Sequence, residues 1–156
     1  MITTSAEPAR LPRVFVDADV VVAGAASVTG ASHLVLKLGE LGLLRVVACS
    51  QVREEVERAL ARKLPAALPV FRSLAEAAVE WLPDPTAEAL QEHAGEADEK
   101  DLPILVAAIR ARTDVLLTFN TRHYRQRTSP PLIERPGAFV RRLRGLLEDL
   151  AGHEEE

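Results

Sequence analysis

The stretch that decides the fold is RVFVDADVVVAG, residues 13–24, in which two carboxylates interrupt an apolar run. Its VFV segment, residues 14–16, has the β-branched and aromatic side chains typical of a buried strand. Asp17 and Asp19 follow at the point where that strand must end. Burying a charge is costly, so core packing alone does not explain two carboxylates here. The pattern therefore predicts a buried strand that carries Asp17 to a site at its carboxyl end.

The composition indicates one globular domain. The 156 residues are 47% hydrophobic and 27% charged, and a chain of this length can bury a sizeable core. The net charge of −4 gives no overall basic field, which argues against a high-affinity, nonspecific nucleic-acid binder. It leaves open an enzyme that meets nucleic acid locally, through a metal ion and a few arginines.

Two features bear on the compartment. Cys49 is the only cysteine, so no disulfide can form within the chain, and a lone thiol suits a reducing compartment. The first 12 residues lack the apolar stretch of a signal peptide, and no window reaches the length of a membrane span. We therefore expect a cytoplasmic protein with no membrane partner. Residues 1–12 are expected to form a flexible lead, residues 13–150 a single domain and residues 151–156 an acidic tail.

Apolar runs alternate with segments of helical period along the chain. Strands alternating with helices predict βαβ units and an α/β fold, with a parallel sheet covered on both faces. Ligands bind such sheets at the carboxyl ends of the strands, where Asp17, Asp19, Thr118 and Asn120 are expected. The predicted strands are VFVD, RVVAC, VLLTF and PLIE, with VEWL as a weaker fifth, at residues 14–17, 45–49, 115–119, 131–134 and 79–82.

Helical phase selects one glutamate in the segment SQVREEVERALARKL, for which Ser50 is a predicted N-cap. Successive residues of a helix are rotated by about 100°. On that basis Glu55 flanks the apolar stripe of this helix, whereas Glu54 and Glu57 point away from it. Glu55 is therefore the glutamate expected to face inward.

A second acidic segment, GEADEKDLP, precedes another helix. Pro103 must lie in the first turn, where its missing N–H costs nothing. Asp101 is therefore expected at the helix N-terminus, at the edge of its apolar face. Asp98 lies just before it and has a plain interpretation as a loop residue.

Each acid has an ordinary structural interpretation when it is taken singly. Asp101 or Asp19 could cap a helix, and Glu55 could be the edge of an amphipathic helix. As a set, however, Asp17, Glu55, Asp101 and Asn120 can converge at one end of one sheet. Oxygen side chains held together repel one another unless a cation lies among them. All-oxygen sites suit Mg²⁺ or Mn²⁺, which act on phosphates.

The segment NTRHYRQR places Arg122, His123 and Arg125 just past Asn120. One interpretation is a solvated loop with Tyr124 partly buried against the core. The other is an RNA-binding patch that grips phosphate beside the metal, with Tyr124 free for base stacking. The sequence favours neither.

The order of these segments resembles that of the PIN-domain ribonucleases, which include the VapC-like toxins of toxin–antitoxin pairs. VFVDADVVVAG is similar to the family's first strand, whose metal-binding Asp is here Asp17. SQVREEVERAL resembles the helix with the family's glutamate, here Glu55, and DEKDLPILVAAI the third acidic segment, here Asp101. LLTFNTRHY is similar to the strand end with a Thr followed by Asp or Asn, here Thr118 and Asn120.

The resemblance implies a three-layer α/β/α fold with a central parallel sheet of about five strands, so that residues 13–150 form one PIN-like domain. It also implies a metal-dependent endoribonuclease that hydrolyses RNA phosphodiester bonds with Mg²⁺ or Mn²⁺. Asp17 and Asp101 would bind the ion, Asn120 would complete or support the site, and Glu55 would position the ion or hold water there. The partners implied are an RNA substrate, a small antitoxin in a type II toxin–antitoxin pair, and further copies of the chain in a homodimer or higher oligomer.

Two positions depart from many members of that family, which carry Asn in place of Asp19 and Asp in place of Asn120. An amide offers a carbonyl oxygen to a cation but no charge, so that Asp98 or Asp19 would have to compensate. The uncharged Asn120 keeps open a PIN-fold module that binds RNA or protein with little or no nuclease activity. A housekeeping RNA-processing nuclease is a further alternative.

A different enzyme class also begins with a strand and Asp-x-Asp, namely the haloacid-dehalogenase-like phosphatases. DAD at residues 17–19 meets that requirement. VVV follows it in place of a Gly-Thr turn, and no later GDxxxD-like segment is present. The sequence therefore favours the nuclease.

Overall fold

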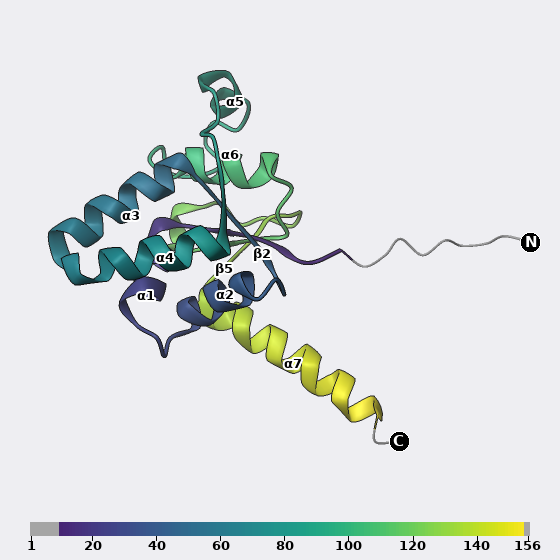
Figure 1. The fold of residues 1–156 in the computed structure, drawn as a ribbon. Helices are drawn as coiled ribbons and strands as arrows, with labels where there is room; N and C mark the ends of the chain where they lie inside the picture. The colour runs from purple at the N-terminus through teal and green to yellow at the C-terminus, as the bar shows by residue number, and fades with distance from the viewer. Residues whose placement is uncertain (1–9, 155–156) are drawn as a thin grey trace, which may run out of the picture.

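The computed structural model describes residues 10–154, which form five strands and seven α-helices (Figure 1). Most of the expected N-terminal lead, residues 1–9, and the last two residues of the expected tail lie outside the described part of the chain. The elements are β1 (Arg13–Val16), α1 (Ala18–Ala26), α2 (Ala31–Glu40), β2 (Arg45–Cys49), α3 (Ser50–Lys63), α4 (Leu68–Ala78), β3 (Val79–Leu82), α5 (Ala87–Glu92), α6 (Leu102–Arg110), β4 (Val115–Leu117), β5 (Leu132–Glu134) and α7 (Pro136–Glu154).

All five strands form one parallel sheet in the order β3-β2-β1-β4-β5. β1 is the central strand, since Val14 is in register with Val46 of β2 on one side and with Val115 of β4 on the other. The predicted α/β fold with a parallel sheet of about five strands is confirmed. Each predicted strand is present, including the weaker VEWL, which forms the β3 edge.

The chain reverses its direction across the sheet after β3. It first moves outward from β1 to β2 and β3, and then returns past β1 to β4 and β5. Because crossover connections between parallel strands are right-handed, the two directions place their helices on opposite faces. Figure 1 shows α1 to α4 on one face and α5 and α6 on the other. The reversal lies between β1 and β4, and ligands in such sheets bind at the carboxyl ends of the strands beside it.

The three inner strands are continuous apolar runs because helices cover both of their faces. Residues 14–16 of β1 and 116–117 of β4 are fully shielded from solvent, and residues 46–49 of β2 are at most 2% exposed. The next polar side chains along the chain are Asp17, directly after β1, and Thr118, directly after β4. Both side chains are themselves buried, so the core extends up to the site.

The predicted capping of α3 by Ser50 is wrong. Ser50 is the first helical residue, and the cap position is Cys49, whose side chain makes no capping bond. Asp84 accepts a hydrogen bond from the backbone N–H of Gln51 at 2.8 Å, while the Ser50 hydroxyl donates to the Leu82 carbonyl at 3.4 Å. β2 runs directly into α3, so the helix N-terminus is satisfied by a side chain 33 positions away that local sequence does not reveal.

α7 starts at Pro136 and extends away from the body of the molecule (Figure 1). Its first turns pack on the core through Phe139, which is 2% exposed. Farther along the helix, Leu146, Leu147 and Leu150 are 53–66% exposed. The helix continues to residue 154, so the first four residues of the expected tail are helical.

Within residues 10–154, no single helix is long and apolar enough to cross a membrane. The bent pair α1 and α2 reaches that length and composition only when the two helices are counted together.

The tight packing of α2 at Gly39, against β2 and the end of α4, generates a stability prediction. A Cβ at Gly39 would lie 2.9 Å from the Ala78 carbonyl oxygen and 2.7 Å from Val46 Cγ2. Because backbone would have to move, we expect Gly39→Ala to lower the free energy of unfolding by about 1–3 kcal/mol. At Gly145 of α7, nothing lies within 4 Å of the added Cβ. Because Ala favours a helix more than Gly does, Gly145→Ala should raise the free energy of unfolding by about 0.5–1 kcal/mol.

Urea unfolding followed by circular dichroism measures both variants. An unchanged midpoint for Gly39→Ala would show that α2 can shift away from the sheet without cost, contrary to this packing argument.

Candidate metal centre

Asp17 is held rigidly at the junction of β1 and β4. Its backbone N–H donates to the Leu117 carbonyl at 3.0 Å, which extends the pairing of the two strands. One carboxylate oxygen, Oδ1, accepts from the Ala18 N–H at 2.8 Å, so Asp17 is the N-cap of α1. The other, Oδ2, accepts from the Thr118 hydroxyl at 3.0 Å. Neighbouring strands therefore set both the position and the orientation of this carboxylate.

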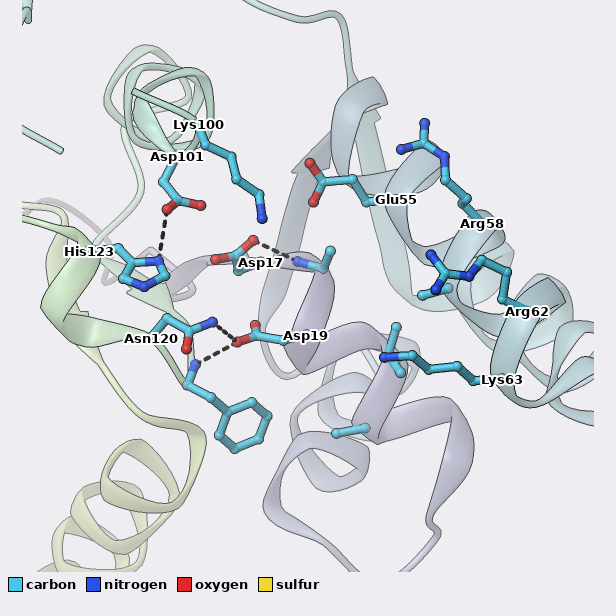
Figure 2. A pocket seen from close by; sticks show the side chains of 15 residues that line it. Asp17, Asp19, Glu55, Arg58, Arg62, Lys63, Lys100, Asp101, Asn120 and His123 are labelled. Carbon is cyan, nitrogen blue, oxygen red and sulfur yellow. Dashed lines mark hydrogen bonds and ion pairs between the residues drawn. The ribbon is translucent and has the colours of Figure 1, made fainter. Parts of the chain in front are cut away.

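Asp19 orients the end of β4. The alternative in which Asp19 caps α1 is wrong, because Asp17 occupies the cap and Asp19 lies in the first turn. Asp19 Oδ2 instead accepts from the Phe119 N–H at 3.0 Å and from the Asn120 side-chain amide at 3.1 Å (Figure 2). These bonds join the first turn of α1 to the segment that follows β4. They use the amide nitrogen of Asn120 and leave its carbonyl oxygen for another partner.

The second oxygen of Asp19, Oδ1, has a different environment. Oδ1 is buried and accepts no hydrogen bond from the described residues. An unpaired buried carboxylate oxygen is costly, and such atoms often mark the place of an ion. A cation bound next to this orphaned oxygen would satisfy it.

Asp101 reaches the site from the start of α6. It occupies the N-cap position, as predicted, but its side chain makes no capping bond. Its Oδ2 hydrogen-bonds instead to Nδ1 of His123 at 2.9 Å. Asp98 Oδ2 lies 4.0 Å from the same ring nitrogen, and one ligand atom from each of the three residues lies within 4.8 Å of the others. A cation could therefore be held by Asp98, Asp101 and His123 as well as by the main group of carboxylates.

The principal candidates converge on one cavity of 690 Å³ (Figure 2). Glu55 projects into it from α3, facing Asp17 and Asp101, with Oε1 accepting a hydrogen bond from Gln51 Nε2 at 3.0 Å. Of the three glutamates in α3, only the one selected by helical phase lines this cavity. Its polar lining includes all four predicted principal residues and one secondary candidate: Asp17, Asp19, Glu55, Asp101 and Asn120.

Other predicted residues lie outside the cavity. Thr118 is fully buried, and Asp98 is exposed and does not line the cavity. Arg122 and Arg125 do not line the cavity either, and only His123 of the predicted RNA-binding patch does. The structure therefore separates most of that patch from the carboxylates.

Tyr124 is buried against the core, as one of its two interpretations expected, and it also contacts the site, which the sequence did not indicate. Its hydroxyl donates to Asp17 Oδ2 at 3.2 Å, and the residue is 6% exposed. The alternative in which Tyr124 is free for base stacking is therefore wrong. Nothing in the sequence indicates this contact, because the two residues are 107 positions apart and Tyr124 lies within a run of charged side chains.

Burial and mutual repulsion perturb the ionisation of the site. The pKa of Asp17 is raised from 3.8 to about 6, chiefly by burial and secondly by the negative charge of Asp19. Burial also raises the pKa of Asp19. Burial and the charge of Asp17 raise the pKa of Tyr124, so its hydroxyl stays protonated and remains a donor. The centre is thus a place where negative charge is held at a cost that a cation would relieve.

Four cationic side chains line the same cavity, and the sequence did not single them out. Arg58, Arg62 and Lys63 come from α3, and Lys100 precedes Asp101. Within residues 10–154, none of the four forms an ion pair with a carboxylate. The cavity therefore combines a carboxylate centre with positive charge that the protein does not neutralise internally.

The residues present fit a hard divalent cation. The donors are carboxylate and amide oxygens, which Mg²⁺ and Mn²⁺ prefer, and one of them is the orphaned Asp19 Oδ1. His123 is the histidine of the cavity lining, and its Nδ1 is hydrogen-bonded to Asp101. The donor set is therefore compatible with a divalent metal ion.

Comparisons with known proteins place the chain beside one family. The family model described as PIN domain matches residues 13–122. Among solved structures, VapBC2 from Rickettsia felis bound to a DNA fragment from its promoter contains a chain with a similar fold, at a TM-score of 0.57 and 15% sequence identity. The similarity covers 79% of this chain and 98% of that one. No curated protein matches the chain in sequence.

The raised pKa of Asp17 predicts how stability depends on pH when divalent cations are removed by EDTA. The folded-state pKa of about 6 lies above the usual 3.8, so the folded protein binds more protons between these values and loses stability as the pH rises through 6. We expect wild type to gain about 1 kcal/mol in free energy of unfolding between pH 7 and pH 5 from this group alone.

Urea unfolding of wild type and Asp17→Asn at the two pH values isolates that contribution. The gain should be smaller by about 1 kcal/mol in Asp17→Asn, which keeps the raised pKa of Asp19, and unchanged in Glu54→Gln, which alters an exposed carboxylate of α3. The same pH dependence in wild type and Asp17→Asn would contradict the assignment.

Proposed function

Because the chain belongs to the PIN-domain family, we propose that it is a metal-dependent endoribonuclease that hydrolyses RNA phosphodiester bonds with Mg²⁺ or Mn²⁺. The observation that carries the proposal is the convergence of Asp17, Glu55 and Asp101 on one cavity from three separate elements. The orphaned oxygen of Asp19 in the same cavity supports it. With its lone Cys49 buried, we expect the protein to act in the reducing cytoplasm.

In this proposal, Asp17 and Asp101 bind the cation and Asn120 completes or supports the site through its carbonyl oxygen. When bound, the cation would activate water and neutralise charge on the phosphate. Thr118 and Tyr124 keep the Asp17 carboxylate in place by donating to Oδ2. Preorganised ligands of this kind are needed because a misplaced ligand weakens both binding and catalysis.

Glu55 and Lys100 are suited to charge and proton movements around the phosphate. Glu55 faces the aspartates from the opposite wall, and Gln51 holds its Oε1, which leaves Oε2 to accept a proton from the attacking water. The Lys100 side chain extends between Asp101 and Glu55 (Figure 2). Its ammonium group would stabilise negative charge on the departing oxygen.

Residues 19 and 120 contact each other, which explains why Asp at position 19 can accompany Asn at position 120. Asn120 Nδ2 donates to Asp19 Oδ2 at 3.1 Å, so one amide and one carboxylate form a hydrogen-bonded pair. Many members of the family that the chain resembles have the reverse arrangement, with Asn at position 19 and Asp at position 120. We propose that Asp19 Oδ1 supplies the anionic ligand that position 120 lacks. Asp98 is less suited to this role because it lies outside the cavity.

A reciprocal exchange tests this assignment. We expect Asp19→Asn to weaken Mn²⁺ binding by about tenfold or more, since loss of a supporting carboxylate typically costs 10–100-fold in metal affinity. The double variant Asp19→Asn with Asn120→Asp should recover most of that affinity, because the amide–carboxylate pair is restored in reverse order. Isothermal titration calorimetry with Mn²⁺ measures both. Wild-type affinity in Asp19→Asn would show that Asp19 only positions the β4 end.

RNA cleavage tests the enzyme itself. Wild type should cleave members of a panel of single-stranded and structured RNAs with Mg²⁺ or Mn²⁺ but not with EDTA. Asp17→Asn and Asp101→Asn should lose about 100-fold or more of this activity, because each removes a ligand of the ion. Asp98→Asn is the matched control and should stay active if the Asp17–Asp101 arrangement holds the ion. Cleavage that persists in EDTA would contradict the proposal.

A toxin is the form of the proposal that the structural comparison favours. The Rickettsia felis structure is of VapBC2, bound to promoter DNA, and its fold covers four fifths of this chain. We therefore expect a small antitoxin partner, with a homodimer or higher oligomer as the assembly. The alternative of a binding module with little nuclease activity depends on the uncharged Asn120, and the Mn²⁺ titration bears on it directly. A housekeeping RNA-processing nuclease would instead cleave RNA and co-purify without a small partner.

A further inference from the structure

The second half of α7 carries an apolar face that residues 10–154 leave exposed. Successive residues of a helix are rotated by about 100°, so Leu146, Leu147 and Leu150 continue the stripe on which Phe139 and Leu143 lie. Phe139 is buried and Leu143 packs partly against the core, whereas the three leucines farther along are each more than half exposed. Figure 1 shows the reason, since α7 extends past the body of the molecule. These three side chains form the leucine face of α7.

Core packing does not account for the leucine face. A surface helix normally turns its apolar stripe toward the core, and a cluster of exposed apolar side chains marks a place of interaction. The family model ends at residue 122, before α7 begins, so the face is not a feature of the matched PIN domain. The carboxylate cavity does not involve it either, because no residue of α7 lines that cavity.

The charges beside the leucine face indicate what covers it. Arg144 and Glu148 lie on one flank of the face, one helical turn apart, with the basic residue first. Within residues 10–154, neither forms an ion pair. When two such helices run antiparallel with Leu146 at the centre, a residue two positions before the centre faces one two positions after it. Arg144 of each copy then lies opposite Glu148 of the other.

The same register matches the apolar side chains. Leu143 comes to lie near Leu150 of the other helix, and the two copies of Leu146 meet at the centre. A parallel arrangement would instead place Arg144 opposite Arg144 and Glu148 opposite Glu148, and facing like charges are unfavourable. The charge order along α7 is therefore complementary to itself only in the antiparallel arrangement, which is the condition for a twofold-symmetric interface.

We propose that the leucine face of α7 pairs antiparallel with the same face of a second copy of this chain. The result is a dimer whose twofold axis passes near Leu146. The inference rests on the proposed function only in that an oligomer is expected there, and it does not depend on cleavage of RNA. It assigns that oligomer to a surface outside the residues that the family model matches.

The body beside α7 adds apolar area to this interface. Val28 is 73% exposed, and it lines a cavity of 430 Å³ between α2 and α7 together with Leu34, Val140 and Arg144. In the antiparallel arrangement, the end of the second helix lies beside the first half of α7, next to this cavity. Three leucines from each copy bury less than the roughly 1,200–2,000 Å² of a typical stable interface. We therefore expect a dimer that dissociates on dilution.

Sedimentation velocity of the full chain over a wide range of concentration tests the interface. Wild type should be a dimer when concentrated and a monomer when diluted. Leu146→Ser should weaken association by about 100-fold or more, because both copies lose a leucine buried at the centre. Leu41→Ser removes an exposed leucine elsewhere and is the matched control, which should associate as wild type does. Thermal unfolding of each variant controls for folding.

A charge exchange tests the antiparallel register. Arg144→Glu should weaken association by about tenfold because it places two acidic side chains opposite each other, and Glu148→Arg should do so by the same reasoning. An equimolar mixture of the two variants should recover association close to that of wild type, since acidic and basic side chains face each other again in the mixed dimer. Mixing changes no contact within either helix, so the recovery reports a contact between copies.

The results that would overturn the proposal are distinct. They are a wild type that stays monomeric at every concentration, a dimer that is equally strong in Leu146→Ser, and two charge variants that do not recover on mixing. A smaller protein that co-purifies with monomeric wild type and is lost in Leu146→Ser would assign the face to that partner instead. These measurements need neither metal nor RNA, so a wild type that dimerises through α7 without cleaving RNA would remove the nuclease alone.

Discussion

The pairing of β1 with β4 is the interaction on which the rest of the site depends. It brings Asp17 and Thr118, 101 positions apart, within 3.0 Å of each other at the point where the chain reverses across the sheet. The same pairing allows Asp19 to hold the backbone of Phe119 and the side chain of Asn120. If β4 lay elsewhere in the sheet, Asp17 would lack its orienting donors and Asn120 would be remote. The apolar strands are thus the rigid frame of a polar site.

The strands hold the carboxylates of Asp17 and Asp19 where burial and mutual repulsion disfavour their negative charge. Asp17 is buried beside Asp19, and its raised pKa expresses the cost of keeping both ionised. Three donors to Asp17 offset part of this cost, whereas Oδ1 of Asp19 makes no hydrogen bond within residues 10–154. A protein that needed only stability would replace such a pair with apolar side chains. A bound cation would offset this cost, because the two carboxylates would then attract the cation instead of only repelling each other.

α3 contributes to both halves of the cavity through one helical face. Glu55 faces the carboxylate centre, and Arg58 and Arg62 extend the same face by up to two turns. Capping by Asp84 starts this helix directly at the end of β2, which fixes how far along the cavity each side chain lies. The length of the helix thereby separates Glu55 from Arg58 and Arg62, and within residues 10–154 neither arginine forms an ion pair with a carboxylate.

The sequence by itself determined the elements and the inward-facing acids. Apolar runs marked four strands and, less clearly, the fifth, in which Glu80 interrupts VEWL. The phase of α3 selected Glu55, and Pro103 placed Asp101 at a helix start. These features depend on residues close together in the chain. Only the tertiary structure decided what completes the site. Tyr124 donates to a carboxylate 107 positions away, and Asp19 accepts hydrogen bonds from the segment after β4 instead of capping α1. The arginines that line the cavity come from α3 and not from the segment after Asn120. These contacts follow from strand order and crossover direction, which arise from packing the whole chain, so no local pattern encodes them.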